Sequence, residues 1–111
     1  MTKVTIYKNK ENVCVGFRVE DHANQSEVGT DIVCAAISML TINTMNAIEQ
    51  FTDVDFKQEV NENDCAMEFM IIEPTDKTTL LLDTMVLGLQ SLEDNEEYET
   101  YIDLIFEEVI P

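Results

Sequence analysis

Apolar residues alternate with polar ones in the first part of the chain. Val4 and Ile6 lie two positions apart, and after a polar stretch the alternation resumes at Val13 and continues to Val19. A period of two places apolar side chains on one face of a β-strand. The sequence therefore predicts a β-hairpin at the start of the chain.

A polar segment, residues 21–30, shows neither strand nor helix periodicity and is predicted to be a loop. From about residue 31 to residue 50 the apolar positions recur every three or four residues, as on one face of an α-helix. The main stripe consists of Val33, Ile37, Leu40, Thr44, Ile48 and Phe51. Thr30 or Asp31 is placed to cap this helix, and the Asp31 carboxylate suits its positive end.

After this helix, the order of two strands followed by a helix is expected a second time. A third strand is expected around Val54 to Val60, and a fourth from Cys65 to Glu73, with Pro74 ending it. A second, strongly apolar helix follows, with Thr75 or Asp76 as its cap.

Alternation of Ile102, Leu104 and Phe106 predicts a last strand from about residue 99 to 109, with a C-terminal helix as the open alternative. Two helices packed on one face of a largely antiparallel sheet of about five strands bury all these apolar faces. The predicted fold is therefore a two-layer α+β domain, and residues 1–111 are expected to form a single domain.

Acidic residues dominate the charge. The chain carries 23 acidic and 6 basic residues, a formal net charge of −17, and after residue 20 the only basic residues are Lys57 and Lys77. Such a chain repels phosphate backbones, so direct nucleic-acid binding is not expected. The acidity favours a basic partner, although charge that only keeps the protein soluble remains an alternative.

Three cysteines, Cys14, Cys34 and Cys65, are too few and too far apart for a disulfide framework or a CxxC-type zinc site. The chain shows no apolar signal segment, and its longest apolar runs are only a few residues. We therefore expect a cytoplasmic protein without a CxxC-type metal site or a membrane anchor.

Candidate chemistry lies where the first loop meets the first helix. His22, the only histidine, precedes Cys34 by twelve residues. An imidazole can make a thiol nucleophilic. A helix that begins near Thr30 or Asp31 also places Cys34 in its first turn. There, free backbone amides and the helix dipole favour a thiolate and can stabilise an oxyanion. The competing interpretation is a small core cysteine and a solvated loop histidine.

Other residues are weaker candidates. Ser38 lies one helical turn after Cys34 and can hydrogen-bond near the site or to its own backbone. Gly16 and Arg18 fall on the face of the hairpin opposite to its apolar residues, where the glycine allows a close approach of another strand, and both are candidate substrate contacts. Cys14 and Cys65 lie in predicted strands and are expected to be buried.

These residues resemble the signature of the ribosomal-processing cysteine proteases, the Prp family. That signature is a histidine followed by alanine, a glycine, a six-residue block around the cysteine, and a serine four residues beyond it. The matching residues are His22-Ala23, Gly29, Asp31-Ile32-Val33-Cys34-Ala35-Ala36 and Ser38. The family usually has glycine before the histidine, whereas this chain has Asp21.

The resemblance implies a homodimeric, cofactor-free, cytoplasmic bacterial endopeptidase. Its substrate would be an N-terminally extended large-subunit ribosomal protein, number twenty-seven, whose basic character suits an acidic enzyme. Cys34 would be the nucleophile and His22 the general base and acid, while Asp31 would structure the helix start. A noncatalytic acidic adaptor that binds a basic ribosomal protein during ribosome assembly is the alternative from another functional class.

Overall fold

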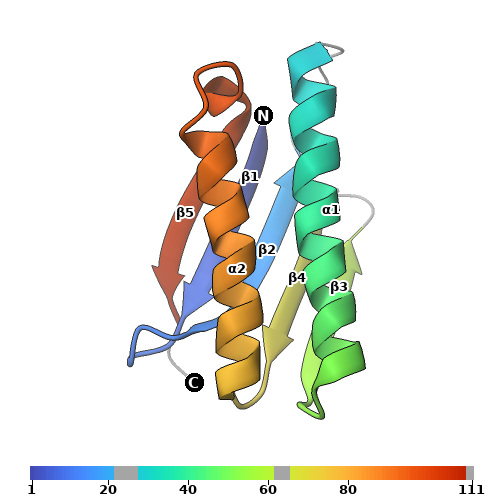
Figure 1. Ribbon diagram of the computed structural model, residues 1–111, viewed down its shortest axis with the longest axis vertical. Helices are drawn as coiled ribbons and strands as arrows, with labels where there is room; N and C mark the ends of the chain where they lie inside the picture. Colours follow the sequence, from blue (N-terminus) through green and yellow to red (C-terminus); the bar gives the residue numbers. More distant parts are fainter. Residues whose placement is uncertain (22–27, 62–65, 110–111) are drawn as a thin grey trace.

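A computed structural model gives the fold and describes residues 1–21, 28–61 and 66–109 (Figure 1). The elements follow the predicted order of strand, strand, helix, strand, strand, helix, strand. They are β1 (Thr2–Lys8), β2 (Cys14–Asp21), α1 (Val28–Phe51), β3 (Phe56–Asn61), β4 (Ala66–Ile71), α2 (Asp76–Glu93), a short 3-10 helix (Glu99–Tyr101) and β5 (Ile102–Glu108).

The five strands form one sheet in the order β3-β4-β2-β1-β5. Pairing is antiparallel between β3 and β4, β4 and β2, and β2 and β1, whereas β5 runs parallel to β1. The predicted largely antiparallel α+β sheet is therefore confirmed, and the last element is a strand rather than a helix.

Both helices lie side by side on one face of the sheet (Figure 1). Directly paired residues share a face, so Ile6, Phe17 and Phe69 from three neighbouring strands point together toward the helices. The Phe17 and Phe69 ring centroids are 5.5 Å apart. From the helices, the most deeply buried core residues are Val33, Ile37, Ile48, Leu82, Met85 and Leu89.

Within the described chain, one segment, Asp31–Phe51, has the length and composition of a membrane span. In this fold it belongs to α1, and Val33, Ile37 and Ile48 bury its inner face in the core against the sheet. Packing against the sheet thus accounts for the apolar residues of its inner face, whereas Met39 and Phe51 on the same helix are exposed.

The second face of the sheet carries the polar partners of the hairpin. Arg18 Nε lies 2.8 Å from Glu20 Oε1, and its Nη1 lies 3.1 Å from Glu68 Oε2. A Cβ added to Gly16 would lie 2.2 Å from the Phe69 carbonyl oxygen. The strand that approaches Gly16 closely is therefore β4, and Arg18 is paired with two glutamates of the sheet. A substrate contact at either residue stays a prediction.

The start of α2 agrees with the sequence. Thr75 is the N-cap, and its hydroxyl accepts a hydrogen bond from the Thr78 backbone amide at 3.2 Å. In return the Thr78 hydroxyl accepts from the Thr75 amide at 2.8 Å. This reciprocal capping box satisfies amides that the helix itself leaves without partners.

Candidate active site

The first helix begins earlier than the sequence pattern predicts. α1 includes Val28, so Thr30 and Asp31 belong to its first turn and are not its cap. Gly29 and the polar residues before it carry no apolar stripe, which is why periodicity alone places the start three residues too late. Asp31 is exposed and keeps a favourable position near the positive end of the helix.

This earlier start changes the surroundings of Cys34. Counted from Val28, Cys34 is the seventh residue of α1. Only the first four amides of a helix lack intrahelical partners, and the dipole effect fades beyond the first turn. The expectation that free helix-start amides surround the Cys34 thiol is therefore wrong, and activation of that thiol has to come from other groups.

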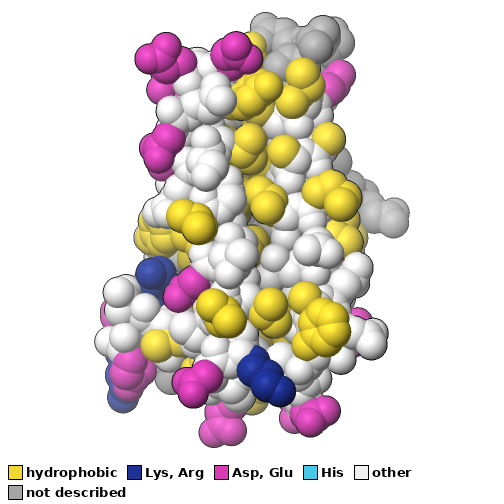
Figure 2. All heavy atoms as spheres, in the orientation of Figure 1, with side chains coloured by type: hydrophobic (Ala, Val, Ile, Leu, Met, Phe, Trp, Pro, Cys, Tyr) yellow, Lys and Arg dark blue, Asp and Glu magenta, His cyan; other side chains and the backbone are white. Residues whose placement is uncertain are grey.

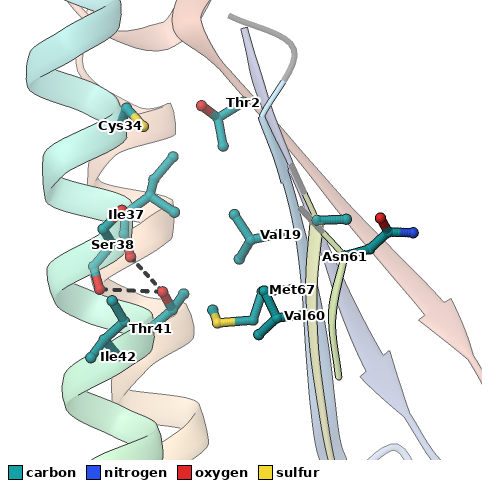
Figure 3. Close-up of a pocket in the computed structure, with 11 residues that line it drawn as sticks. Thr2, Val19, Cys34, Ile37, Ser38, Thr41, Ile42, Val60, Asn61 and Met67 are labelled. Carbon is teal, nitrogen blue, oxygen red and sulfur yellow. Dashed lines mark hydrogen bonds between the residues drawn. The ribbon is translucent and has the colours of Figure 1, made fainter. Parts of the chain in front are cut away.

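Cys34 lies in the wall of a pocket of about 430 Å³ between α1 and the sheet (Figure 3). Cys34 is half buried, and the side chains that line the pocket around it are mostly apolar. The lining residues from α1 are Cys34, Ile37, Ser38, Thr41 and Ile42; those from the sheet are Thr2, Val19, Val60, Asn61, Ala66 and Met67. A partly exposed thiol beside an apolar pocket is suited to attack a bound peptide.

Ser38 lines the same pocket one helical turn after Cys34, as its spacing predicts, and it is exposed. The neighbouring Thr41 hydroxyl donates to the Ile37 carbonyl at 2.8 Å and lies 3.4 Å from the Ser38 carbonyl. Asp31 is not part of the pocket lining. Ser38 therefore lines the pocket together with Cys34, whereas Asp31, one helical turn before Cys34 on α1, does not.

Cys14 has a different environment. It is 1% exposed within the core, and its Sγ lies 3.7 Å from the Gly16 carbonyl oxygen, to which the thiol donates. Burial disfavours the charged thiolate and raises the pKa of Cys14 to about 11. This confirms the prediction of a buried, unreactive Cys14; Cys65 lies outside the described residues.

His22, the predicted base, also lies outside the described residues. The chain that leads to it is placed, because β2 ends at Asp21 and Asp21 pairs with Thr2 of β1. Thr2 in turn lines the pocket that contains Cys34. β2 therefore ends at the edge of the pocket, one residue before His22.

Thr2 is a pocket residue that no sequence motif predicts. Its position two residues before Val4 and four before Ile6 places it on the helix-facing side of β1, and that periodicity was the available signal. In the parts of the chain that the structure describes, no three His, Cys, Asp or Glu side chains are grouped so as to hold a metal ion.

Comparison with known proteins decides the family. The family model described as "Cysteine protease Prp" matches residues 1–103. The chain belongs to the Prp family of cysteine proteases. A "Ribosomal processing cysteine protease Prp" of Staphylococcus aureus is 34% identical over 107 residues, which cover 94% of this chain and 97% of the relative.

Two solved structures of Prp agree with this assignment. The essential ribosomal-processing protease Prp from S. aureus in complex with a substrate peptide superposes with a TM-score of 0.85 at 29% identity, covering 96% of this chain and all of the other. The same S. aureus protein with a covalently linked product peptide gives a TM-score of 0.82 at 30% identity, with the same coverage. Both the α+β fold and the resemblance seen in the sequence are thereby confirmed, and the chain is a cysteine protease of the ribosomal-processing family.

Proposed function

We propose that this protease removes the N-terminal extension of large-subunit ribosomal protein number twenty-seven, with Cys34 as nucleophile and His22 as general base and acid. The observation that carries the proposal is the position of Cys34 in the wall of a mostly apolar pocket, whereas Cys14 is buried with a raised pKa. The covalently linked product peptide in the S. aureus relative is consistent with a nucleophilic mechanism.

The proposed reaction has two steps. In the first, the Cys34 thiolate forms a bond to the scissile carbonyl carbon, and the carbonyl electron pair moves onto oxygen. When this intermediate collapses, the C–N bond breaks and the leaving amine takes a proton from the His22 imidazolium. In the second, neutral His22 takes a proton from water, which attacks the thioester, releases the carboxylic acid product and restores the thiolate.

Charge favours a basic substrate. The formal net charge is −17, and the residues from Glu93 to Glu97 are all exposed at the end of α2. An acidic surface attracts the basic segments typical of ribosomal proteins and speeds the encounter. The same charge disfavours direct binding to nucleic acid, and we place the reaction in the cytoplasm, where ribosomal proteins are made.

We also propose that the protein acts as a homodimer. Figure 2 shows apolar side chains along the surface over α1 and α2, with acidic side chains toward the two ends of the molecule. Met39 is 70% exposed, Leu80 69% and Leu87 65%, a degree of apolar exposure that is typical of protein contact surfaces. Sedimentation velocity of the purified protein tests this proposal, and a single monomeric species contradicts it.

Mass spectrometry of the N-terminally extended ribosomal protein tests the proposed activity. Incubation with the wild-type protein should shorten the substrate at its N-terminus, whereas the Cys34→Ala variant should leave it intact. A substrate that stays intact with wild type contradicts the proposal. If the substrate is bound by wild type, Cys34→Ala and His22→Ala alike but never cleaved, the protein is the noncatalytic adaptor.

A further inference from the structure

One buried polar atom in the pocket has no hydrogen-bond partner. Thr2 is 1% exposed, and its Oγ1 is the only such orphaned side-chain atom among the described residues. Thr2 lines the pocket together with Cys34. In Figure 3 its hydroxyl oxygen points across the pocket toward the side of α1 that carries Cys34.

Other buried threonines satisfy their hydroxyl groups within the fold. Thr41, in the same pocket, donates to the Ile37 carbonyl at 2.8 Å, and Thr44 donates to the Leu40 carbonyl at 2.7 Å. Both are helical and can bond back to the preceding turn. Thr2 lies on a strand, where its side chain projects away from its own backbone, so its partner has to come from elsewhere.

A buried hydroxyl without a partner destabilises a fold, whereas valine fills the same space without this cost. The hydroxyl therefore points to a hydrogen bond that forms only when the pocket is occupied. An extended peptide brings a carbonyl oxygen with every residue. Val19, Ile37 and Met67 offer such an oxygen no donor from their side chains, and the Thr41 hydroxyl already donates to the Ile37 carbonyl. Ser38 and Asn61 also line the pocket, but Thr2 carries the buried hydroxyl that has no partner within the fold.

We infer that the Thr2 hydroxyl is a substrate contact, donating a hydrogen bond to a carbonyl oxygen of the peptide bound beside Cys34. This inference rests on the proposed function and deepens it, because it assigns to the sheet side of the pocket a role in peptide recognition. The carbonyl belongs either to the peptide backbone or to a carboxamide side chain.

The test compares two reagents on Cys34. A peptidyl chloromethyl ketone alkylates a cysteine after its peptide has bound, whereas iodoacetamide needs no binding. Labelling rates of Cys34 are measured by mass spectrometry for wild type, Thr2→Val and Thr2→Ser, and the rate that remains in Cys34→Ala is subtracted. Thr2→Val should slow labelling by the peptidyl reagent about tenfold, as expected for one hydrogen bond, without changing the iodoacetamide rate.

Two controls separate recognition from folding. Thr2→Ser keeps the hydroxyl and should label within about threefold of wild type with both reagents. Thr2→Val replaces the orphaned hydroxyl by a methyl group, so its melting temperature should equal or exceed that of wild type. If both reagents label Cys34 equally more slowly in Thr2→Val, and the melting temperature of this variant is lowered, Thr2 has a structural role. This result overturns the inference.

The outcomes also separate this inference from the proposed function. If the peptidyl reagent labels wild type no faster than iodoacetamide does, the pocket does not recognise peptides, and the proposed function fails together with the inference. If wild type prefers the peptidyl reagent and Thr2→Val keeps that preference, only the role of Thr2 is overturned.

Pairs of peptidyl reagents identify the carbonyl. The two members of a pair are identical except at one position, where one carries glutamine and the other methionine, and each position of the peptide is tested in turn. A backbone carbonyl predicts that Thr2→Val slows every reagent equally. A carboxamide predicts that it slows only the reagent with glutamine at the recognised position.

Discussion

Two regions of this protein contain a described cysteine, and they differ in how tightly they are packed. Cys14 is 1% exposed in the core, and Gly16, two residues further along β2, has no room for an added methyl group. The pocket around Cys34 keeps about 430 Å³ open and contains an unsatisfied hydroxyl. Under the proposed function, the chemistry belongs to the second region, whereas the first region contributes to stability, so changes in each should affect different measurements.

A large loss of catalysis is expected from a change at His22, between β2 and α1 in the sequence. His22→Ala removes the proposed base and acid, and should lower kcat by about 10²- to 10⁴-fold, the usual contribution of general acid–base catalysis. The melting temperature should stay close to that of wild type. Activity within threefold of wild type would mean that another group activates the Cys34 thiol.

Thiol labelling sharpens the contrast between the two cysteines. With a pKa of about 11, Cys14 is roughly one-thousandth ionised at pH 8, whereas an ordinary exposed thiol with a pKa of about 8.5 is roughly one-quarter ionised. Iodoacetamide at pH 8 should therefore label Cys34, which is half buried at the pocket, much faster than Cys14, which is buried in the core. Peptide mapping of the labelled native protein measures the ratio, and comparable labelling of both would contradict the assignment.

The same pKa predicts how stability depends on pH. Because folding raises the pKa of Cys14 from 9.0 to about 11, the folded state holds the thiol proton more tightly than the unfolded state. This contribution to stability is complete below pH 9 and is lost as the pH rises toward 11. Urea unfolding of wild type and Cys14→Ala at pH 8 and pH 10 should show a steeper loss in wild type.

Two glycines give a matched test of packing. A Cβ at Gly16 would meet the Phe69 carbonyl oxygen at 2.2 Å and Met70 Sδ at 2.6 Å, so Gly16→Ala should destabilise the fold by about 2 to 3 kcal/mol. At Gly88 the Cβ meets only the Leu40 side chain, with Cδ2 at 2.8 Å and Cδ1 at 3.2 Å, and alanine gains about 1 kcal/mol of helix propensity. Gly88→Ala should therefore change stability little, as measured by urea unfolding; equal losses at both glycines would contradict this account.

The smallest effect is expected on the second face of the sheet. Arg18 bridges Glu20 and Glu68 with about a third of its side chain exposed, so Arg18→Met should cost about 0.5 to 1 kcal/mol of stability, less in high salt. The KM for a peptide substrate should not change. A tenfold rise in KM would restore the view of Arg18 as a substrate contact.

Local rules predicted some elements and missed others. The start of α2 was predictable because Thr75 directly follows Pro74 and its hydroxyl accepts a hydrogen bond from the amide three residues further on. The proline does not itself end the strand, since β4 ends at Ile71. The start of α1 was not predictable, because Gly29 and its polar neighbours carry no apolar period. The motif around Cys34 identified the family, which the comparisons confirm.

The pocket could not be predicted from the spacing of residues along the sequence. It joins Thr2, Cys34 and Val60, which come from β1, α1 and β3, and residues so distant in sequence are brought together only by the pairing of the sheet and the packing of α1 upon it. The parallel placement of β5 beside β1 is non-local in the same sense. Alternation predicts that a strand exists but not which strand it pairs with.

The most direct test of this account exchanges the two cysteines for alanine, one at a time, in a single experiment. Cleavage of the extended ribosomal protein and the melting temperature are measured for both variants. We expect Cys34→Ala to lose cleavage by about 10⁴-fold or more at an unchanged melting temperature, and Cys14→Ala to keep cleavage while losing about 1 kcal/mol of stability. Cleavage that survives in Cys34→Ala, or disappears in a folded Cys14→Ala, would contradict the central claim.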